Sequence, residues 1–105
     1  MSIEQILNDN LAFAEGVEVL LQKKPKEKAL AKAVEELGEL VVALMQHLNK
    51  PKPTDDKKIS IELIDVQMHL ILLQRYYPEK LLSETADEQV EKMITSDDYN
   101  SWKNS

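Results

Sequence analysis

The chain has 105 residues, the size of a single domain, and 43% of them are hydrophobic, which is enough for a packed core. Because it contains only two glycines and one phenylalanine, and strand-like alternation of apolar and polar residues is scarce, a β-sandwich or a doubly wound sheet is disfavoured. Cysteine is absent, which excludes disulfides, thiol catalysis and thiolate-bound metal.

The charge balance narrows the range of partners. A formal net charge of −6 disfavours a nucleic-acid polymer, whose phosphates an acidic surface repels, and it suits a protein that binds divalent cations. The first residues lack the basic and apolar regions of a signal peptide. No run of about 18 apolar residues is present, so we expect no membrane segment and a cytoplasmic location.

Hydrophobic residues recur with helical spacing along four segments, which predicts an all-α domain. Ser2 and Gln5 form a capping-box pattern at the start of the first segment, and Pro25 follows its end. Thr85 and Glu88 form a second such pattern at the start of the last segment. The predicted helices cover residues of about 3–22, 27–48, 59–77 and 85–95, within one domain at 1–105 that ends in a polar tail at 96–105.

Residues 49–58, with the sequence NKPKPTDDKK, predict a loop between the second and third helices because they contain two prolines and no apolar residue. Asp55 or Asp56 is placed to cap the third helix. Such a loop allows the two helices to pack side by side as an antiparallel hairpin.

The second predicted helix carries three acidic residues on one face. Glu35, Glu36 and Glu39 lie within about 60° of Lys32 around the helix axis. One interpretation is a solvent-exposed face with an i,i+4 ion pair between Lys32 and Glu36. The face lies roughly opposite an apolar arc that consists of Leu30, Ala33, Val34, Leu37, Leu40, Val41, Leu44, Met45 and Leu48.

The third predicted helix places two carboxylates, Glu62 and Asp65, among apolar residues instead of on its polar stripe. Burying them there is costly unless partners or a metal ion neutralise their charge. In an antiparallel hairpin they would approach Glu36 and Glu39 of the second helix. An oxygen-rich cage of this kind suits Mg²⁺ or Mn²⁺.

Alternatives stay open for these acids. Salt bridges to Lys32 or Arg75 would neutralise them without metal. A di-iron site is disfavoured because neither His47 nor His69 has a glutamate three residues before it. His69 is expected to pack in the core or to hydrogen-bond a carboxylate.

Two segments carry a resemblance to a known family. KAVEELGELVVAL (32–44), followed by IELIDVQMHLILLQ (61–74), resembles the MazG-type all-α nucleoside triphosphate pyrophosphohydrolases, whose signature is Glu-Glu-x-x-Glu on one helix and Glu-x-x-Asp on the next. The resemblance implies a four-helix bundle completed by oligomerisation, as a homodimer or a dimer-of-dimers tetramer. It also implies Mg²⁺-dependent cleavage of a (deoxy)nucleoside triphosphate between its α- and β-phosphates, which would serve nucleotide-pool housecleaning.

The resemblance also implies roles for the acidic residues. The family's metal ligands correspond to Glu36, Glu39, Glu62 and Asp65, which would hold Mg²⁺. The first glutamate of the motif, Glu35, would orient or deprotonate the attacking water.

Candidate substrate contacts are more dispersed along the chain. Lys32 matches a lysine of the family and would contact phosphate or only pair with Glu36, and Lys92 matches a lysine of the family's last helix. Phe13 and Tyr76 are candidates for stacking on the base, with core packing as the alternative. The family's late arginine is missing here, and lysines of the loop (Lys50, Lys52, Lys57 and Lys58) are possible substitutes, although lysines in a polar loop are usually solvated.

Two other functions stay open. The segment ELIDVQMHLILL, with His69 at a matching place, also resembles the phosphoribosyl-ATP pyrophosphohydrolases. A non-catalytic helical module would instead use its acidic face to bind a basic partner. In every case the third helix is apolar around most of its circumference, and a chain this short cannot cover it alone, so we expect a homo-oligomer.

Overall fold

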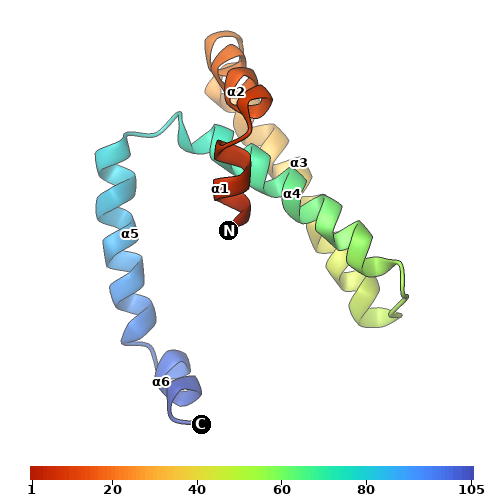
Figure 1. Ribbon diagram of the computed structural model, residues 1–105. Coiled ribbons are helices and arrows are strands. Elements are labelled where there is room, and N and C mark those ends of the chain that lie inside the picture. The colour runs from red at the N-terminus through yellow and green to blue at the C-terminus, as the bar shows by residue number, and fades with distance from the viewer.

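The computed structural model describes residues 1–105 and contains helices and no strands (Figure 1). The all-α prediction is therefore confirmed. The predicted number of four helices is wrong, because the chain forms six. They are α1 (Ile3–Asn8), α2 (Leu11–Lys23), α3 (Lys26–Asn49), α4 (Asp55–Gln74), α5 (Glu79–Ile94) and α6 (Asp97–Lys103).

The centre of the fold is the antiparallel hairpin of α3 and α4, which run side by side along their length (Figure 1). α1 packs against α4, and α2 joins α1 to the start of the hairpin. After α4 the chain turns away, and α5 and α6 extend from the hairpin without lying along it (Figure 1). The predicted hairpin is thus present, and its loop is shorter than expected because residues 55–58 already belong to α4.

The face of α3 that packs against α4 is built from small residues and one glutamate. Its buried residues are Ala29, Ala33, Glu36 and Ala43, at spacings of four, three and seven, which keep them on one face as in a seam between helices. Alanine side chains allow two backbones to approach closely, so a carboxylate in this seam is held between the helices. The interpretation of the acidic face as solvent-exposed is therefore wrong for Glu36 and holds for the exposed Glu35 and Glu39.

The apolar arc predicted on α3 is largely uncovered. Val34 is 69% exposed and Leu48 is 79% exposed. Only eight hydrophobic residues in the chain are buried, whereas every residue of α5 is exposed, including Leu82 and Val90. No helix combines the length and the apolar character that crossing a membrane requires.

Side-chain caps explain why the chain forms two helices, α1 and α2, where one was predicted. Ser2 caps α1 as predicted, since its Oγ accepts a hydrogen bond from the Gln5 N–H at 3.1 Å. Asn10 then starts α2, because its Oδ1 accepts from the Phe13 N–H at 3.0 Å. A short polar side chain that bonds the backbone in this way competes with a continuous helix.

Prolines and caps also set the remaining bounds. α4 ends at Gln74 instead of residue 77, and Pro78, which disfavours helical backbone at the residue before it, keeps the helix from continuing into α5. α5 starts directly after Pro78, so the predicted start at Thr85 falls inside the helix. The predicted polar tail contains α6, which Ser96 caps by accepting from the Tyr99 N–H at 3.1 Å.

Candidate metal centre

Glu36 is the central acidic side chain of the hairpin. Its side chain is only 9% exposed, and its Oε1 lies 3.3 Å from the Nζ of Lys32, one turn earlier on α3. Its Oε2 is buried and has no hydrogen-bond partner. A buried carboxylate oxygen without a partner is costly, which makes this atom a candidate metal ligand.

The opposite helix presents a second oxygen of the same kind. The Oε2 of Glu62, on α4, is also buried without a hydrogen-bond partner. Glu36, Glu62 and Asp65 each place a carboxylate oxygen within 4.8 Å of the other two. Both helices of the hairpin therefore contribute to one cluster, which contains three of the four predicted metal ligands and leaves out Glu39.

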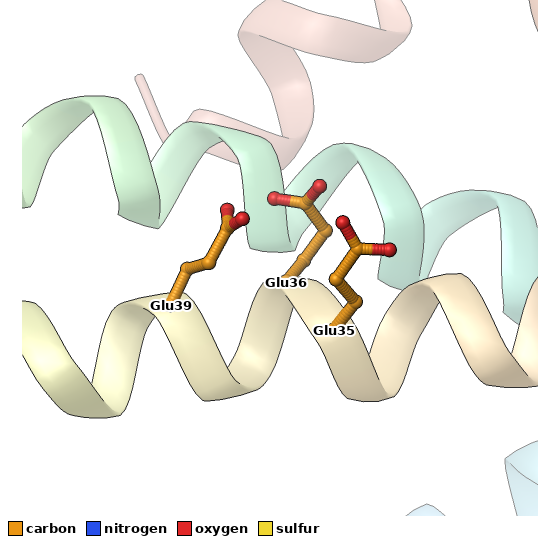
Figure 2. Close-up of side chains that lie close together, drawn as sticks. All are labelled: Glu35, Glu36 and Glu39. Carbon is orange, nitrogen blue, oxygen red and sulfur yellow. The ribbon is translucent and has the colours of Figure 1, made fainter.

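A second group of carboxylates shares Glu36 with the first. Glu35, Glu36 and Glu39 also bring oxygens within 4.8 Å of one another. Figure 2 shows that all three side chains project from α3 toward α4. The five acids singled out from the sequence are thus gathered on one side of the hairpin, where Glu36 joins the two groups.

The carboxylates of the cluster lie close enough to repel one another and to shift a pKa. The negative charge of Glu36 raises the pKa of Glu39 above its ordinary value, and desolvation and the charge of Glu62 act in the same direction. The pKa of Lys32 is raised as well, chiefly by its hydrogen bond to Glu36 and then by its hydrogen bond to Glu35. The nearby carboxylates thus disfavour the ionised form of Glu39, and a bound cation would relieve that repulsion.

The metal-free alternative requires basic partners, and the cluster has one. Lys32 contacts the Oε1 atoms of both Glu35 and Glu36 at 3.3 Å. Arg75 pairs instead with Glu18 of α2 at 2.9 Å. Lys32 is therefore the only basic residue that forms an ion pair with these five carboxylates, and the buried Oε2 atoms of Glu36 and Glu62 have no hydrogen-bond partner.

His69 lies one turn beyond Asp65 on α4. Its Nδ1 is 2.7 Å from the backbone carbonyl oxygen of Asp65, so the ring bonds the main chain and not a carboxylate. The residue is half-buried and lines an apolar hollow between α2 and α4 together with Phe13. The predicted base-stacking residue Phe13 thus shares a hollow with His69 and with none of the five carboxylates.

The other two predicted substrate contacts lie elsewhere. The hydroxyl of Tyr76 donates to the backbone carbonyl of Lys24 at 2.5 Å, which ties the end of α4 to the connection between α2 and α3. Lys92 belongs to the last turn of α5, which leads away from the hairpin (Figure 1). The single chain therefore does not bring Lys92 to the carboxylates.

A second cation lies beside the cluster, and it is one of the four loop lysines that the sequence offered as substitutes for the missing arginine. Lys58 lines the same hollow as Glu35, Glu39 and Glu62. The signal in the sequence is its position one helical turn before Glu62, but this becomes visible only once α4 is known to begin at Asp55.

A second polar contact closes the tip of the hairpin. The Nδ1 of His47 lies 2.8 Å from the Oδ2 of Asp55, and the same oxygen accepts from the Lys52 N–H at 2.8 Å. The hydrogen bond with His47 holds the pKa of Asp55 below its ordinary value, and the bond from the Lys52 N–H adds to this effect. This contact ties the start of α4 to the end of α3.

No family model, curated protein or solved structure matches the chain.

Proposed function

We propose that the protein is a Mg²⁺-dependent nucleoside triphosphate pyrophosphohydrolase. The observation that carries the proposal is the pair of buried, unpartnered carboxylate oxygens on Glu36 and Glu62, with Asp65 beside them. A buried anion is tolerated when it is paired or binds a metal ion. The resemblance of the two acidic motifs to the MazG-type enzymes supports the same function.

The donor set fits a hard divalent cation. Glu36, Glu39, Glu62 and Asp65 would hold the ion, and all four supply carboxylate oxygen, which Mg²⁺ and Mn²⁺ prefer over softer metals. When bound, the ion would neutralise phosphate oxygens and lower the pKa of a coordinated water. The remaining chemistry belongs to the side chains of the chain.

Glu35 is the proposed base. Its side chain is 57% exposed and is held by Lys32 at 3.3 Å, so it is open to a substrate while its direction is fixed. Water would attack the α-phosphorus and lose its proton to Glu35. The bond from the α-phosphorus to the bridging oxygen would break, giving a nucleoside monophosphate and pyrophosphate.

We further propose that the active form is a homodimer or a dimer of dimers. The arc of α3 that faces away from α4 is apolar and uncovered, and α5 carries exposed leucine, valine, methionine and isoleucine side chains. Large exposed apolar surfaces mark interaction sites. A second copy would cover these surfaces and would complete the four-helix bundle that the family resemblance implies.

A nucleotide screen tests the proposed activity. Purified protein is incubated with ribo- and deoxyribonucleoside triphosphates and with phosphoribosyl-ATP, in Mg²⁺, Mn²⁺ or EDTA. Phosphate is measured with and without added inorganic pyrophosphatase. We expect phosphate only when both metal and pyrophosphatase are present. Phosphate without pyrophosphatase would indicate a different phosphohydrolase, and no product from any nucleotide would favour the non-catalytic helical module.

A further inference from the structure

Lys58 stands between two hollows of opposite character. On one side is the hollow that it shares with the carboxylates Glu35, Glu39 and Glu62. On the other is a hollow at the tip of the hairpin, whose lining contains no hydrophobic residue and includes three lysines, Lys50, Lys52 and Lys58. The negative and the positive side chains of this end of the hairpin therefore meet at Lys58.

The amine of Lys58 is free to take an anion. Its Nζ donates to the Oε1 of Gln46 at 2.6 Å, and it forms no ion pair with a carboxylate. A lysine amine has three donors, and the bond to Gln46 uses one of them. The bond also directs the side chain of Lys58 toward α3.

The order of side chains along α4 gives the site a direction. Lys58 and Glu62 are one turn apart on the same face, an axial separation of about 6 Å. Toward the loop lies the hollow lined by Lys50 and Lys52, and past Asp65 lies a separate apolar hollow, where Met68 and Leu72 face α2. An extended ligand with a charged end and an apolar end would lie along this line in one orientation.

We propose that Lys58 binds the outer phosphates of the substrate, the β- and γ-groups that leave as pyrophosphate. The inference rests on the proposed pyrophosphohydrolase function and adds the orientation of the substrate, whose phosphate chain points to the tip of the hairpin. Four carboxylates and one Mg²⁺ leave the centre with excess negative charge. The outer phosphates therefore need a cation beyond the metal, and ammonium groups bind phosphate by charge-assisted hydrogen bonds.

The test compares two exposed lysines. Lys58→Gln removes the charge beside the carboxylates, and Lys58→Arg keeps it. The control is Lys103→Gln, which removes the same charge from an exposed residue of α6, outside both hollows. Each protein is titrated with inorganic triphosphate in saturating Mg²⁺ by calorimetry, and KM and kcat are measured with the best nucleotide of the screen.

We expect Lys58→Gln to weaken triphosphate binding and to raise KM about fivefold to tenfold, with a smaller change in kcat. Lys58→Arg is expected to retain most of the affinity, and Lys103→Gln to behave as the unmodified protein. A merely structural role would lower the melting temperature of Lys58→Gln and leave KM and triphosphate affinity unchanged, which would overturn the inference.

The two proposals fail in different ways. If the unmodified protein cleaves nucleotides and Lys58→Gln matches the Lys103→Gln control, only the role of Lys58 is wrong. If the unmodified protein neither cleaves a nucleotide nor binds inorganic triphosphate, both proposals are wrong. The calorimetric titration tests Lys58 even when turnover is absent, since it measures phosphate binding directly.

Discussion

Glu36 of α3 and Glu62 of α4 face each other across the hairpin, and each buries an Oε2 that has no hydrogen-bond partner. Neighbouring residues of the α3 seam are alanines, so this pair occupies positions that apolar side chains would fill in a purely structural hairpin. Two like charges at such positions reduce the stability of the metal-free protein. The cluster is therefore expected to trade stability for the capacity to bind a cation.

Because these carboxylates would bind the metal but repel one another without it, one substitution is expected to have opposite effects on activity and stability. Glu62→Gln removes a metal ligand and places an amide donor near the orphan oxygen of Glu36. We expect turnover to fall at least about 100-fold, while metal-free stability stays the same or rises on the order of 1 kcal/mol. Urea denaturation in EDTA and the nucleotide assay measure the two effects.

Glu15→Gln, at an exposed position of α2, is the control for charge removal and should change neither property. A Glu62→Gln protein that unfolds, or one that retains full turnover, would contradict the proposed role of this carboxylate.

The raised pKa of Glu39 predicts a dependence of stability on pH. Because Glu36 and Glu62 disfavour its ionised form, folded Glu39 binds its proton more tightly than unfolded Glu39. Stability of the metal-free protein is then expected to decrease as pH rises from the ordinary value of 4.5 through the raised pKa. Glu39→Gln should flatten this decrease, as should saturating Mg²⁺.

Denaturant midpoints measured between pH 4 and pH 8, in EDTA and in Mg²⁺, would test this linkage. The expected signature is a gain in midpoint on adding Mg²⁺ that grows with pH. A gain that is independent of pH, or none at all, would show that Mg²⁺ does not bind at these carboxylates.

Asp55, at the tip of the hairpin, predicts a pH dependence of stability that is opposite in sign to that of Glu39. Its pKa is lowered from 3.8 by its hydrogen bond with His47 and then by the bond from the Lys52 N–H. The stability that this ionised group contributes is present above pH 3.8 and is lost as pH falls through the lowered pKa. Asp55→Asn should lower stability at pH 6 and weaken the loss of stability on acidification.

Asp56→Asn is the matched control, because Asp56 is adjacent and exposed and its side chain makes no hydrogen bond. Acid titrations followed by circular dichroism would compare the two variants. Equal effects of the two substitutions would assign the change to the N-terminal charge of α4 and not to the contact with His47.

Local signals in the sequence predicted the hairpin well and its packing poorly. The prolines at 51 and 53 mark the loop, and the apolar periodicity marks α3 and α4, because both are properties of short segments. The burial of Glu36 could not be predicted in this way. The alanine face of α3 lies beside an arc of larger leucine and valine residues, so the sequence favours the larger residues as the buried face. Only tertiary packing decides that α4 covers the alanine face.

The break between α1 and α2 shows the same limit. Asn10 is an acceptable cap, but its position within an otherwise continuous apolar pattern gives no reason to prefer a cap over a helix. The candidate site was easier to predict, because Glu62 and Asp65 conflict with their apolar surroundings, and such a conflict is visible in the sequence alone. Lys58 carried no such conflict, since a lysine near a loop is expected at the surface.

The uncovered apolar arc of α3 predicts that stability depends on protein concentration. For a folded dimer, each tenfold increase in concentration adds about 1.4 kcal/mol per mole of dimer to the free energy of unfolding. Val34→Glu, at the 69% exposed position on α3, should yield a smaller species and a melting temperature that no longer rises with concentration. Val19→Glu, half-exposed on α2, is the control for charge in a helix. Sedimentation and light scattering over a hundredfold range of concentration would measure the effect. If the unmodified protein is a monomer at every concentration, the proposed oligomer is wrong. The carboxylate cluster would still stand, because it lies within one chain.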